Sequence, residues 1–256
     1  MKYMGSKTKI GKDILNCMLS NIDINQYESF IEPFVGGANF TSLFVQDSRC
    51  EHLNYQGFDY NYYVVALLNY MADGNKYTRI HTKEEYNQCR DYIRGRISHV
   101  PFEDYEIGFL GICCSYCGRW FEGFASVTKT RNGMRDYQEE ARKNINNQVH
   151  TLKGLSFNYG DYKNLKVTNS IIYCDPPYKN TKEYFSKINH EEFYYWCREM
   201  VKHDNVIFVS SYDMPIDFKC IWEKQVKSTL SSNGEVDRKT KQSTEKLFIL
   251  TKGNIQ

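Results

Sequence analysis

The stretch Ser170-Ile171-Ile172-Tyr173-Cys174-Asp175-Pro176-Pro177-Tyr178 joins an apolar run to a carboxylate, two prolines and an aromatic ring. An apolar run of this kind that ends in a turn predicts a buried strand of an α/β sheet, and ligands bind beyond the carboxyl ends of such strands. The prolines fix the backbone and leave their carbonyls free to accept hydrogen bonds. We interpret residues 175–178 as a site for an amine on a flat ring; a plain Pro-Pro turn capped by Asp175 is the alternative.

The composition describes a globular chain. Hydrophobic residues make up 41% of the 256 residues, and the nine cysteines have no regular spacing, which favours reduced thiols over a disulfide framework. No apolar run approaches the roughly 20 residues needed to cross a bilayer. We therefore expect a soluble, cytoplasmic protein without membrane contact. The net charge of +2 favours an anionic partner only weakly.

A second strand and turn precede this stretch in the chain. Residues 29–34 predict a short buried strand, the turn Val35-Gly36-Gly37-Ala38 follows, and residues 39–45 predict a helix. Small residues at such a turn let backbone amides approach a nucleotide-like cofactor. Gly-Gly turns between a strand and a helix also occur without a ligand, so the turn by itself leaves both interpretations open.

Asp59 ends the next predicted strand, residues 56–58. It follows the glycine turn by about twenty residues, the spacing of the acidic residue that holds ribose hydroxyls in Rossmann-type sites. The alternative role for Asp59 is to cap the helix predicted over residues 62–71.

The pattern changes between residues 72 and 150. A capping box at residues 82–85 opens a polar helix that runs to Arg94, and no alternating strand pattern follows, so we expect an inserted, mainly helical module. Residues 108–124 interleave glycines with aromatic side chains and are too rich in glycine for a stable helix. Such a loop either lays rings and amides against DNA or packs only the core of its own module.

Basic residues follow this loop. They predict a stretch that contacts phosphates, although a solvated helix face gives the same pattern. Cys114 and Cys117 form a Cys-x-x-Cys pair, but the sequence offers no second pair, so we expect no metal site. The candidate DNA-binding residues of the module are Tyr116, Arg119, Trp120, Lys129, Arg131 and Arg135.

The α/β pattern returns after the module. Asn189 and Glu192 predict the start of a helix, and three strands are expected at residues 206–209, 222–226 and 245–250. The polar stretch 228–244 joins the last two strands. Three basic residues within it are candidates for phosphate contacts: Arg238, Lys239 and Lys241.

In this order the motifs resemble those of Dam-type DNA adenine-N6 methyltransferases of the alpha arrangement. The resemblance spans nearly the whole chain and rests on Lys2–Lys7, Glu32–Gly37, Asp59–Asn61, Asp161 and Asp175–Tyr178. The chain departs from the usual Phe-x-Gly-x-Gly turn at Ala38. Residues 108–124 also lack the asparagine-containing signature associated with GATC, and the chain is more similar to members from phages or mobile elements. The target sequence is therefore left open.

The resemblance implies an α/β, Rossmann-like class I methyltransferase fold with an inserted, mainly helical target-recognition domain. Residues 1–71 and 151–256 would form the S-adenosylmethionine-dependent catalytic domain, and residues 72–150 the insertion that binds double-stranded DNA. The implied reaction is site-specific methylation of adenine N6 on a base flipped out of the duplex, without a metal. The protein is expected to be a monomer or weak dimer, with or without a cognate restriction endonuclease.

The resemblance also assigns roles to residues. Asp175 and the carbonyl of Pro176 would accept the two amine hydrogens, and Tyr178 would stack on the base. The implied catalytic residues are Asp175, Pro176, Pro177 and Tyr178. The implied cofactor-binding residues are Tyr3, Lys7, Glu32, Pro33, Phe34, Gly36, Gly37, Asp59 on the ribose, Asp161 on the adenine amine, and Asp175.

Two other functions stay open at this point. Another amino-methyltransferase, acting on cytosine N4, RNA or a protein glutamine, would keep the cofactor site and change the acceptor pocket. Asp175, where the glutamine enzymes carry Asn, and the sizeable insertion argue against a glutamine acceptor. The other alternative is a non-catalytic DNA-binding relative, which would bind the cofactor without turnover on any DNA.

Overall fold

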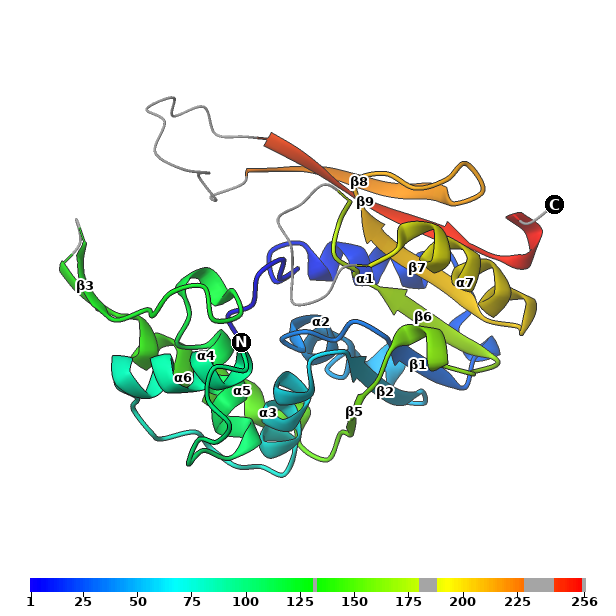
Figure 1. Cartoon of the computed structure of the whole chain (residues 1–256). Coiled ribbons are helices and arrows are strands. Elements are labelled where there is room, and N and C mark those ends of the chain that lie inside the picture. The colour runs from blue at the N-terminus through cyan, green and yellow to red at the C-terminus, as the bar shows by residue number, and fades with distance from the viewer. Residues whose placement is uncertain (131–132, 180–187, 228–241, 255–256) are drawn as a thin grey trace.

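A seven-stranded mixed sheet forms the centre of the larger part of the molecule (Figure 1). The structure is a computed structural model that describes residues 1–130, 133–179, 188–227 and 242–254. The strands of the sheet are β1 (Ser29–Glu32), β2 (Asn54–Asp59), β5 (Phe157–Tyr159), β6 (Ser170–Cys174), β7 (Val206–Ser211), β8 (Lys219–Lys227) and β9 (Gln242–Leu250).

The order β5-β2-β1-β6-β7-β9-β8 is that of a Rossmann-like class I methyltransferase fold. The first five strands in this order pair in parallel, whereas β9 pairs antiparallel with both β7 and β8. The strand order reverses between β1 and β6. In open α/β sheets a reversal of this kind opens a crevice at the carboxyl ends of the strands, and ligands bind there.

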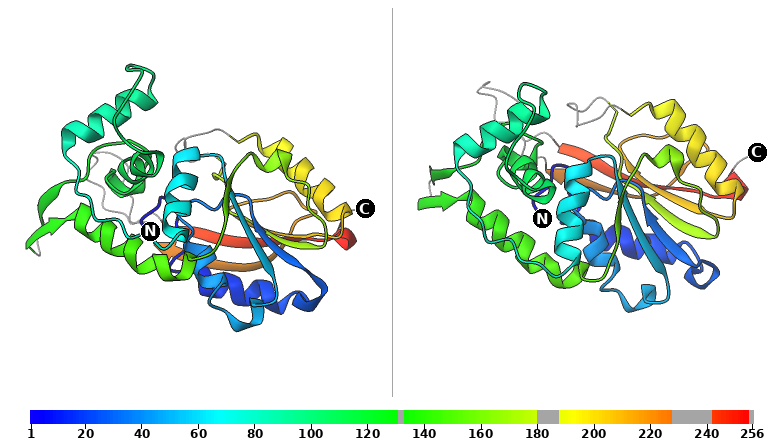
Figure 2. Two further views of the ribbon diagram at one scale, coloured as in Figure 1. Left: turned by 90° about the horizontal axis from the view of Figure 1, so that it is seen from below. Right: turned by 60° about the horizontal axis from the view of Figure 1, so that its bottom comes forward.

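Helices cover both faces of the sheet, which is why its central strands are mostly apolar and buried. All five residues of β6 are buried. On one face, α1 (Gly11–Ser20) and α2 (Asn39–Phe44) pack on Phe30, Tyr173 and Phe208. On the other face, α7 (His190–Lys202) packs on Ile172 and Val209. Figure 2 shows α1 and α7 on opposite sides of the sheet.

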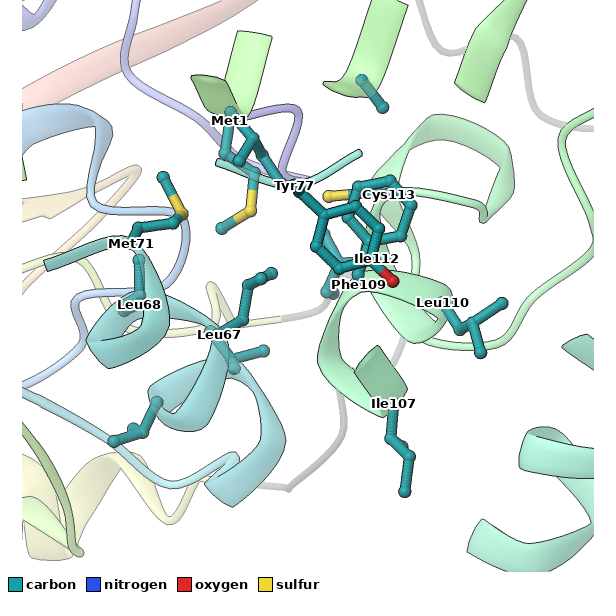
Figure 3. Close-up of a cluster of buried hydrophobic side chains, with 14 of the residues drawn as sticks. Met1, Leu67, Leu68, Met71, Tyr77, Ile107, Phe109, Leu110, Ile112 and Cys113 are labelled. Carbon is teal, nitrogen blue, oxygen red and sulfur yellow. The ribbon is translucent and has the colours of Figure 1, made fainter. Parts of the chain in front are cut away.

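The second part of the molecule is mainly helical. It consists of α4 (Lys83–Ile93), α5 (Asp104–Ile112) and α6 (Tyr137–Leu152), with the antiparallel hairpin β3 (Val127–Thr130) and β4 (Gly133–Asp136). These helices share a core with α3 (Tyr62–Ala72), where Leu67 and Leu68 meet Phe109 and Ile112 (Figure 3). Short 3-10 helices lie at Ile24–Gln26, Ser48–Cys50, Tyr116–Gly118, Tyr162–Asn164 and Lys252–Asn254.

Most of the predicted elements are confirmed. The capping box of Thr82 and Glu85 opens α4, Asn189 caps α7, and strands form at the three places expected after residue 200. The cap of α3 is Asn61, whose side chain accepts from the N–H groups of Tyr63 and Val64, so the alternative role of Asp59 as that cap is wrong.

Two expectations for the module are wrong. Residues 108–112 were expected to be irregular, but they continue α5. Helix α5 packs so closely on α3 that an added Cβ at Gly108 would lie 2.1 Å from the carbonyl oxygen of Tyr63. This close packing requires a glycine and offsets the poor helix propensity of that residue. The β3–β4 hairpin was not expected, because its eight residues are exposed or half-buried and show no apolar alternation.

The described residues contain neither a disulfide nor a group of side chains that could hold a metal ion. The nine cysteines are free, and no group of His, Cys, Asp or Glu side chains in the described ranges is arranged to hold a metal ion. Among the same residues, none of the helices has the length and apolarity that would let it cross a bilayer.

Candidate active site

The parallel strands bring four separate motifs to one edge of the sheet. The glycine turn follows β1, Asp59 ends β2, Asp161 lies just beyond β5, and Asp175 directly follows β6. Because these strands are neighbours in the order β5-β2-β1-β6, their carboxyl ends lie side by side. The edge includes the strand-order reversal, so the candidate cofactor and acceptor residues flank the expected crevice.

The glycine turn is held against β2 and covered by Tyr3. Gly36 has φ +49°, and its N–H donates to Asp59 Oδ2 at 2.8 Å. An added Cβ at Gly36 would lie 2.8 Å from Tyr3 Cε1, and one at Gly37 would lie 2.8 Å from Tyr3 Cβ. The two glycines therefore let Tyr3 pack directly on the backbone of the turn. Ala38, the departure from the family pattern, is buried and has a left-handed conformation at the start of α2.

Asp59, at the end of β2, is linked to the glycine turn after β1 because its carboxylate accepts hydrogen bonds from backbone amides. Its Oδ1 accepts from the N–H of Asn61 at 2.8 Å, and its Oδ2 accepts from Gly36. Burial raises the pKa of Asp59, while the backbone hydrogen bonds from Asn61, Gly36 and Tyr60 oppose that rise. An ionised carboxylate has about four acceptor positions, so acceptor capacity remains for a hydroxyl of a ligand.

Glu32 lies in the interior behind the glycine turn. It is 2% exposed, and its Oε2 accepts from Thr41 Oγ1 at 2.8 Å and from the hydroxyl of Tyr55 at 3.1 Å. Burial raises the pKa of Glu32 to about 8, although both hydrogen bonds oppose the rise. The next two residues also lie in the interior: Pro33 is buried, and the centroid of the Phe34 ring lies 5.4 Å from that of the Tyr162 ring.

Asp161 is half-buried and caps a short 3-10 helix, with its Oδ1 accepting from the N–H of Lys163 at 3.0 Å. The Gly160 N–H donates to the carbonyl of Asp59 at 3.0 Å, which ties the end of β5 to the end of β2. Two exposed rings that the sequence reasoning missed flank this edge, Tyr60 and Tyr159, with centroids 6.2 Å apart. Their place at the ends of β2 and β5 was the available signal.

Four side chains gather around Asp175, and together with it they form what we call the acceptor cluster. Lys7 Nζ lies 2.8 Å from Asp175 Oδ1 and 4.8 Å from the centroid of the Tyr178 ring. The Tyr178 hydroxyl donates to Glu245 Oε2 at 2.8 Å. The Tyr212 ring meets the Tyr178 ring edge-on, with centroids 4.6 Å apart. The members are Lys7, Asp175, Tyr178, Tyr212 and Glu245.

The electrostatics of the acceptor cluster are dominated by burial. Burial raises the pKa of Asp175, and the adjacent ammonium group of Lys7 opposes that rise. A carboxylate beside an aromatic ring in a poorly solvated place suits a group that carries or develops positive charge. Lys7 currently supplies that charge, so the structure places Lys7 at the acceptor end of the site while Tyr3 covers the glycine turn.

Sequence reasoning missed Glu245 and Tyr212. Glu245 comes near the start of β9, and Tyr212 directly follows β7. Because β9 pairs antiparallel with β7, with Ser211 opposite Lys246, the two residues reach the same edge as Asp175. Glu245 lies within the polar first half of β9, where a charged residue is too common to have been identified in advance.

The candidate DNA-binding residues have different environments. Tyr116 is 60% exposed, but Trp120 packs on Gly111 and on the Tyr63 ring, 6.1 Å away, as part of the module's core. Arg119 lies 3.5 Å from Glu122. On the hairpin, Lys129 is exposed, and Arg135 pairs with Glu140 at 2.6 Å. Four further candidates lie outside the described residues: Arg131, Arg238, Lys239 and Lys241.

Comparisons with known proteins identify a family for this chain. Residues 3–200 match the family model of the D12 class N6 adenine-specific DNA methyltransferases. The rRNA methyltransferase AviRa from Streptomyces viridochromogenes is 10% identical, with a TM-score of 0.45 over 97% of this chain and 86% of that chain. The Thermoplasma acidophilum protein 1320 is 9% identical, with a TM-score of 0.40 over 94% of this chain and 87% of that chain. The comparison with curated proteins gave no match.

Proposed function

The chain belongs to the family of D12 class N6 adenine-specific DNA methyltransferases, and from this premise we propose that it methylates N6 of an adenine flipped out of double-stranded DNA at a specific sequence. The methyl donor would be S-adenosylmethionine. The observation that carries the proposal is the acceptor cluster. It places the Asp175 carboxylate and the Tyr178 ring at the carboxyl end of β6, next to the glycine turn after β1.

The residues on the β1 side suit the proposed cofactor. Gly36 and Gly37 have no side chains to keep a ligand from the backbone, and Asp59 has acceptor capacity left for ribose hydroxyls. Asp161 and Tyr60 are candidates for the adenine of the cofactor, and Tyr3 would cover its methionine end. When bound, S-adenosylmethionine supplies a methyl group on a positively charged sulfur, which is a good leaving group.

The residues on the β6 side suit an exocyclic amine. Asp175 and the carbonyl of Pro176 would accept its two hydrogens, which biases the nitrogen from planar toward tetrahedral and exposes its lone pair. Positive charge that develops on the nitrogen would be stabilised by the carboxylate and by the face of Tyr178. Such contacts strengthen as the reaction proceeds, so they raise the rate and not merely the affinity.

Access to the amine requires the base to leave the duplex. Flipping costs a few kcal/mol, which stacking on Tyr178 would partly offset. We assign the reading of the target sequence to the module, with Tyr116, Arg119, Lys129 and Arg135 as candidate contacts on described residues. Arg135 would exchange its exposed partner Glu140 for phosphate at little cost, since solvent screens exposed ion pairs.

The test is single-molecule sequencing of plasmid DNA from cells that lack adenine methylation and express the protein. The wild-type chain is expected to produce N6-methyladenine at one recurring sequence. Asp175→Ala is expected to reduce this modification by about a thousandfold or more, because it removes the acceptor of the amine hydrogens. Asp73→Ala, which alters an exposed aspartate at the end of α3, is the matched control and should leave it unchanged.

Three outcomes would count against the proposal. Wild-type methylation that persists in Asp175→Ala at more than about a tenth of its level would contradict the role of Asp175. Methylated cytosine N4 or methylated RNA, without methyladenine in DNA, would mean that the acceptor is a different amine. Cofactor binding with no methylated product would indicate a non-catalytic relative.

A further inference from the structure

Lys7 occupies the contacts that the proposed acceptor amine needs. Its ammonium group donates to Gly5 O at 3.1 Å, pairs with Asp175 Oδ1 at 2.8 Å and lies over the Tyr178 ring. A carboxylate and a ring face are the two groups assigned above to the amine and base of adenine. Lys7 is therefore a cationic substitute for the substrate amine, and an adenine that enters the pocket competes with it for Asp175 and Tyr178.

A second carboxylate lies within reach of Lys7. Glu245 Oε2 is 3.9 Å from Lys7 Nζ, so a shift of about 1 Å would give it the distance that Asp175 has now. The side chain of Glu245 is 13% exposed, and its Oε2 is fixed by the Tyr178 hydroxyl. Little water screens its attraction for Lys7, and the carboxylate is already in position.

On the basis of the proposed function, we propose that Lys7 closes the acceptor pocket in the ligand-free protein by pairing with Asp175, and that it passes to Glu245 when the target adenine enters. Glu245 is then a positioning residue. It holds the Tyr178 ring by its hydroxyl and receives Lys7, which frees the Asp175 carboxylate for the amine. The exchange keeps the ammonium group paired throughout, which matters because an unpaired buried charge is costly.

The groups that contact Lys7 come from two strands of the sheet. They are Asp175 and Tyr178 after β6, and Glu245 on β9. Among the described residues, Lys7 is the cation that pairs with both carboxylates.

The decisive variant is Glu245→Gln. It keeps an acceptor for the Tyr178 hydroxyl but loses the negative charge that attracts Lys7. Single-turnover methyl transfer to plasmid DNA, at saturating S-adenosylmethionine, is expected to fall about tenfold or more near neutral pH. Affinities for S-adenosylhomocysteine and for DNA should be unchanged.

The double variant tests whether Glu245 acts through Lys7 or only through packing. In a Lys7→Met background there is no ammonium group to transfer, so Glu245→Gln should add no further loss of rate. A purely structural role of Glu245 would cost the same factor with or without Lys7, and that result would overturn the proposal.

A ligand-free measurement tests the first half of the proposal without methyl transfer. Acetylation of lysines by N-hydroxysuccinimidyl acetate, followed by mass spectrometry, should label Lys7 slowly in wild type and in Glu245→Gln, but faster in Asp175→Asn. Lys12, exposed on α1, is the internal control and should label equally in all three. Equal labelling of Lys7 in all three proteins would mean that Asp175 does not hold it and would overturn the inference.

The two proposals fail in different ways. Absence of methyl transfer by the wild-type protein on every DNA would refute the proposed function, and the inference would fall with it. Normal wild-type transfer, with a Glu245→Gln defect that is equally large in the Lys7→Met background, would refute the inference alone.

Discussion

Glu32 combines a buried carboxyl group with two neutral hydrogen-bond donors. Burial raises its pKa from an ordinary 4.5 to about 8, so folding favours the protonated form. A group with a raised folded-state pKa stabilises the fold below its unfolded pKa, and this contribution is lost as the pH rises through the folded pKa. The free energy of unfolding of the wild-type protein should therefore fall between about pH 5 and pH 9.

Glu32→Gln should remove this dependence. A neutral amide oxygen can still accept from Thr41 and Tyr55, so the variant should gain stability over wild type as the pH rises, by a few kcal/mol at about pH 9. Urea unfolding at several pH values measures the difference. Glu51→Gln, at an exposed position, is the control and should follow wild type. A constant difference between Glu32→Gln and wild type across this range would show that Glu32 ionises normally in the fold.

At the scale of elements, α5 depends on two glycines that helix propensity alone disfavours. Gly108→Ala would gain about 1 kcal/mol of propensity, but its Cβ would lie 2.1 Å from the carbonyl oxygen of Tyr63 on α3. Backbone cannot rotate away as a side chain can, so the helices must separate, and we expect a net loss of about 1–3 kcal/mol in stability.

Thermal or urea unfolding of Gly108→Ala measures this balance. Gly160→Ala is the matched control, because its added Cβ meets nothing nearer than Phe58 Cδ1 at 3.9 Å. If Gly108→Ala were as stable as wild type, the α3–α5 contact would be looser than the structure indicates.

The same elements show what the sequence could predict. Buried strands and capped helices follow from local signals: β6 is an almost entirely apolar run, and Thr82 and Glu85 form their capping box within four residues of the chain. The motifs at the ends of β1, β2 and β6 could likewise be placed at one edge, because parallel strands share a carboxyl end.

The predictions that were wrong or missing concern contacts that local sequence patterns do not encode. Gly108 and Gly111 were taken as helix breakers, since the sequence does not reveal that Tyr63 and Trp120 press on them. The exposed β3–β4 hairpin leaves no apolar period to detect. Glu245 reaches Tyr178 across 67 positions of the chain, a contact set by the antiparallel pairing of β9 with β7 that no local pattern encodes.

At the scale of the whole molecule, residues 2–7 connect the module to the sheet. Lys2 Nζ lies 4.9 Å from the centroid of the Tyr137 ring on α6, and the backbone of Lys2 and Tyr3 packs against Gly118 of the module. The Tyr3 ring covers the glycine turn, and Lys7 reaches the acceptor cluster. One short segment thus contacts the proposed DNA-reading part, the proposed cofactor site and the acceptor cluster.

This arrangement predicts that Tyr3→Ala weakens two kinds of binding at once. Without its ring the segment loses its hold on the glycine turn, so affinity for S-adenosylhomocysteine should fall about tenfold, or about 1.4 kcal/mol. DNA affinity at fixed salt should also fall, because Lys2 and the Gly118 loop are anchored through the same residue. Calorimetry and fluorescence anisotropy measure the two affinities, and Tyr195→Ala, at an exposed position on α7, should change neither. A loss confined to S-adenosylhomocysteine would mean that Tyr3 serves the cofactor site alone and that the module is held by its shared core with α3.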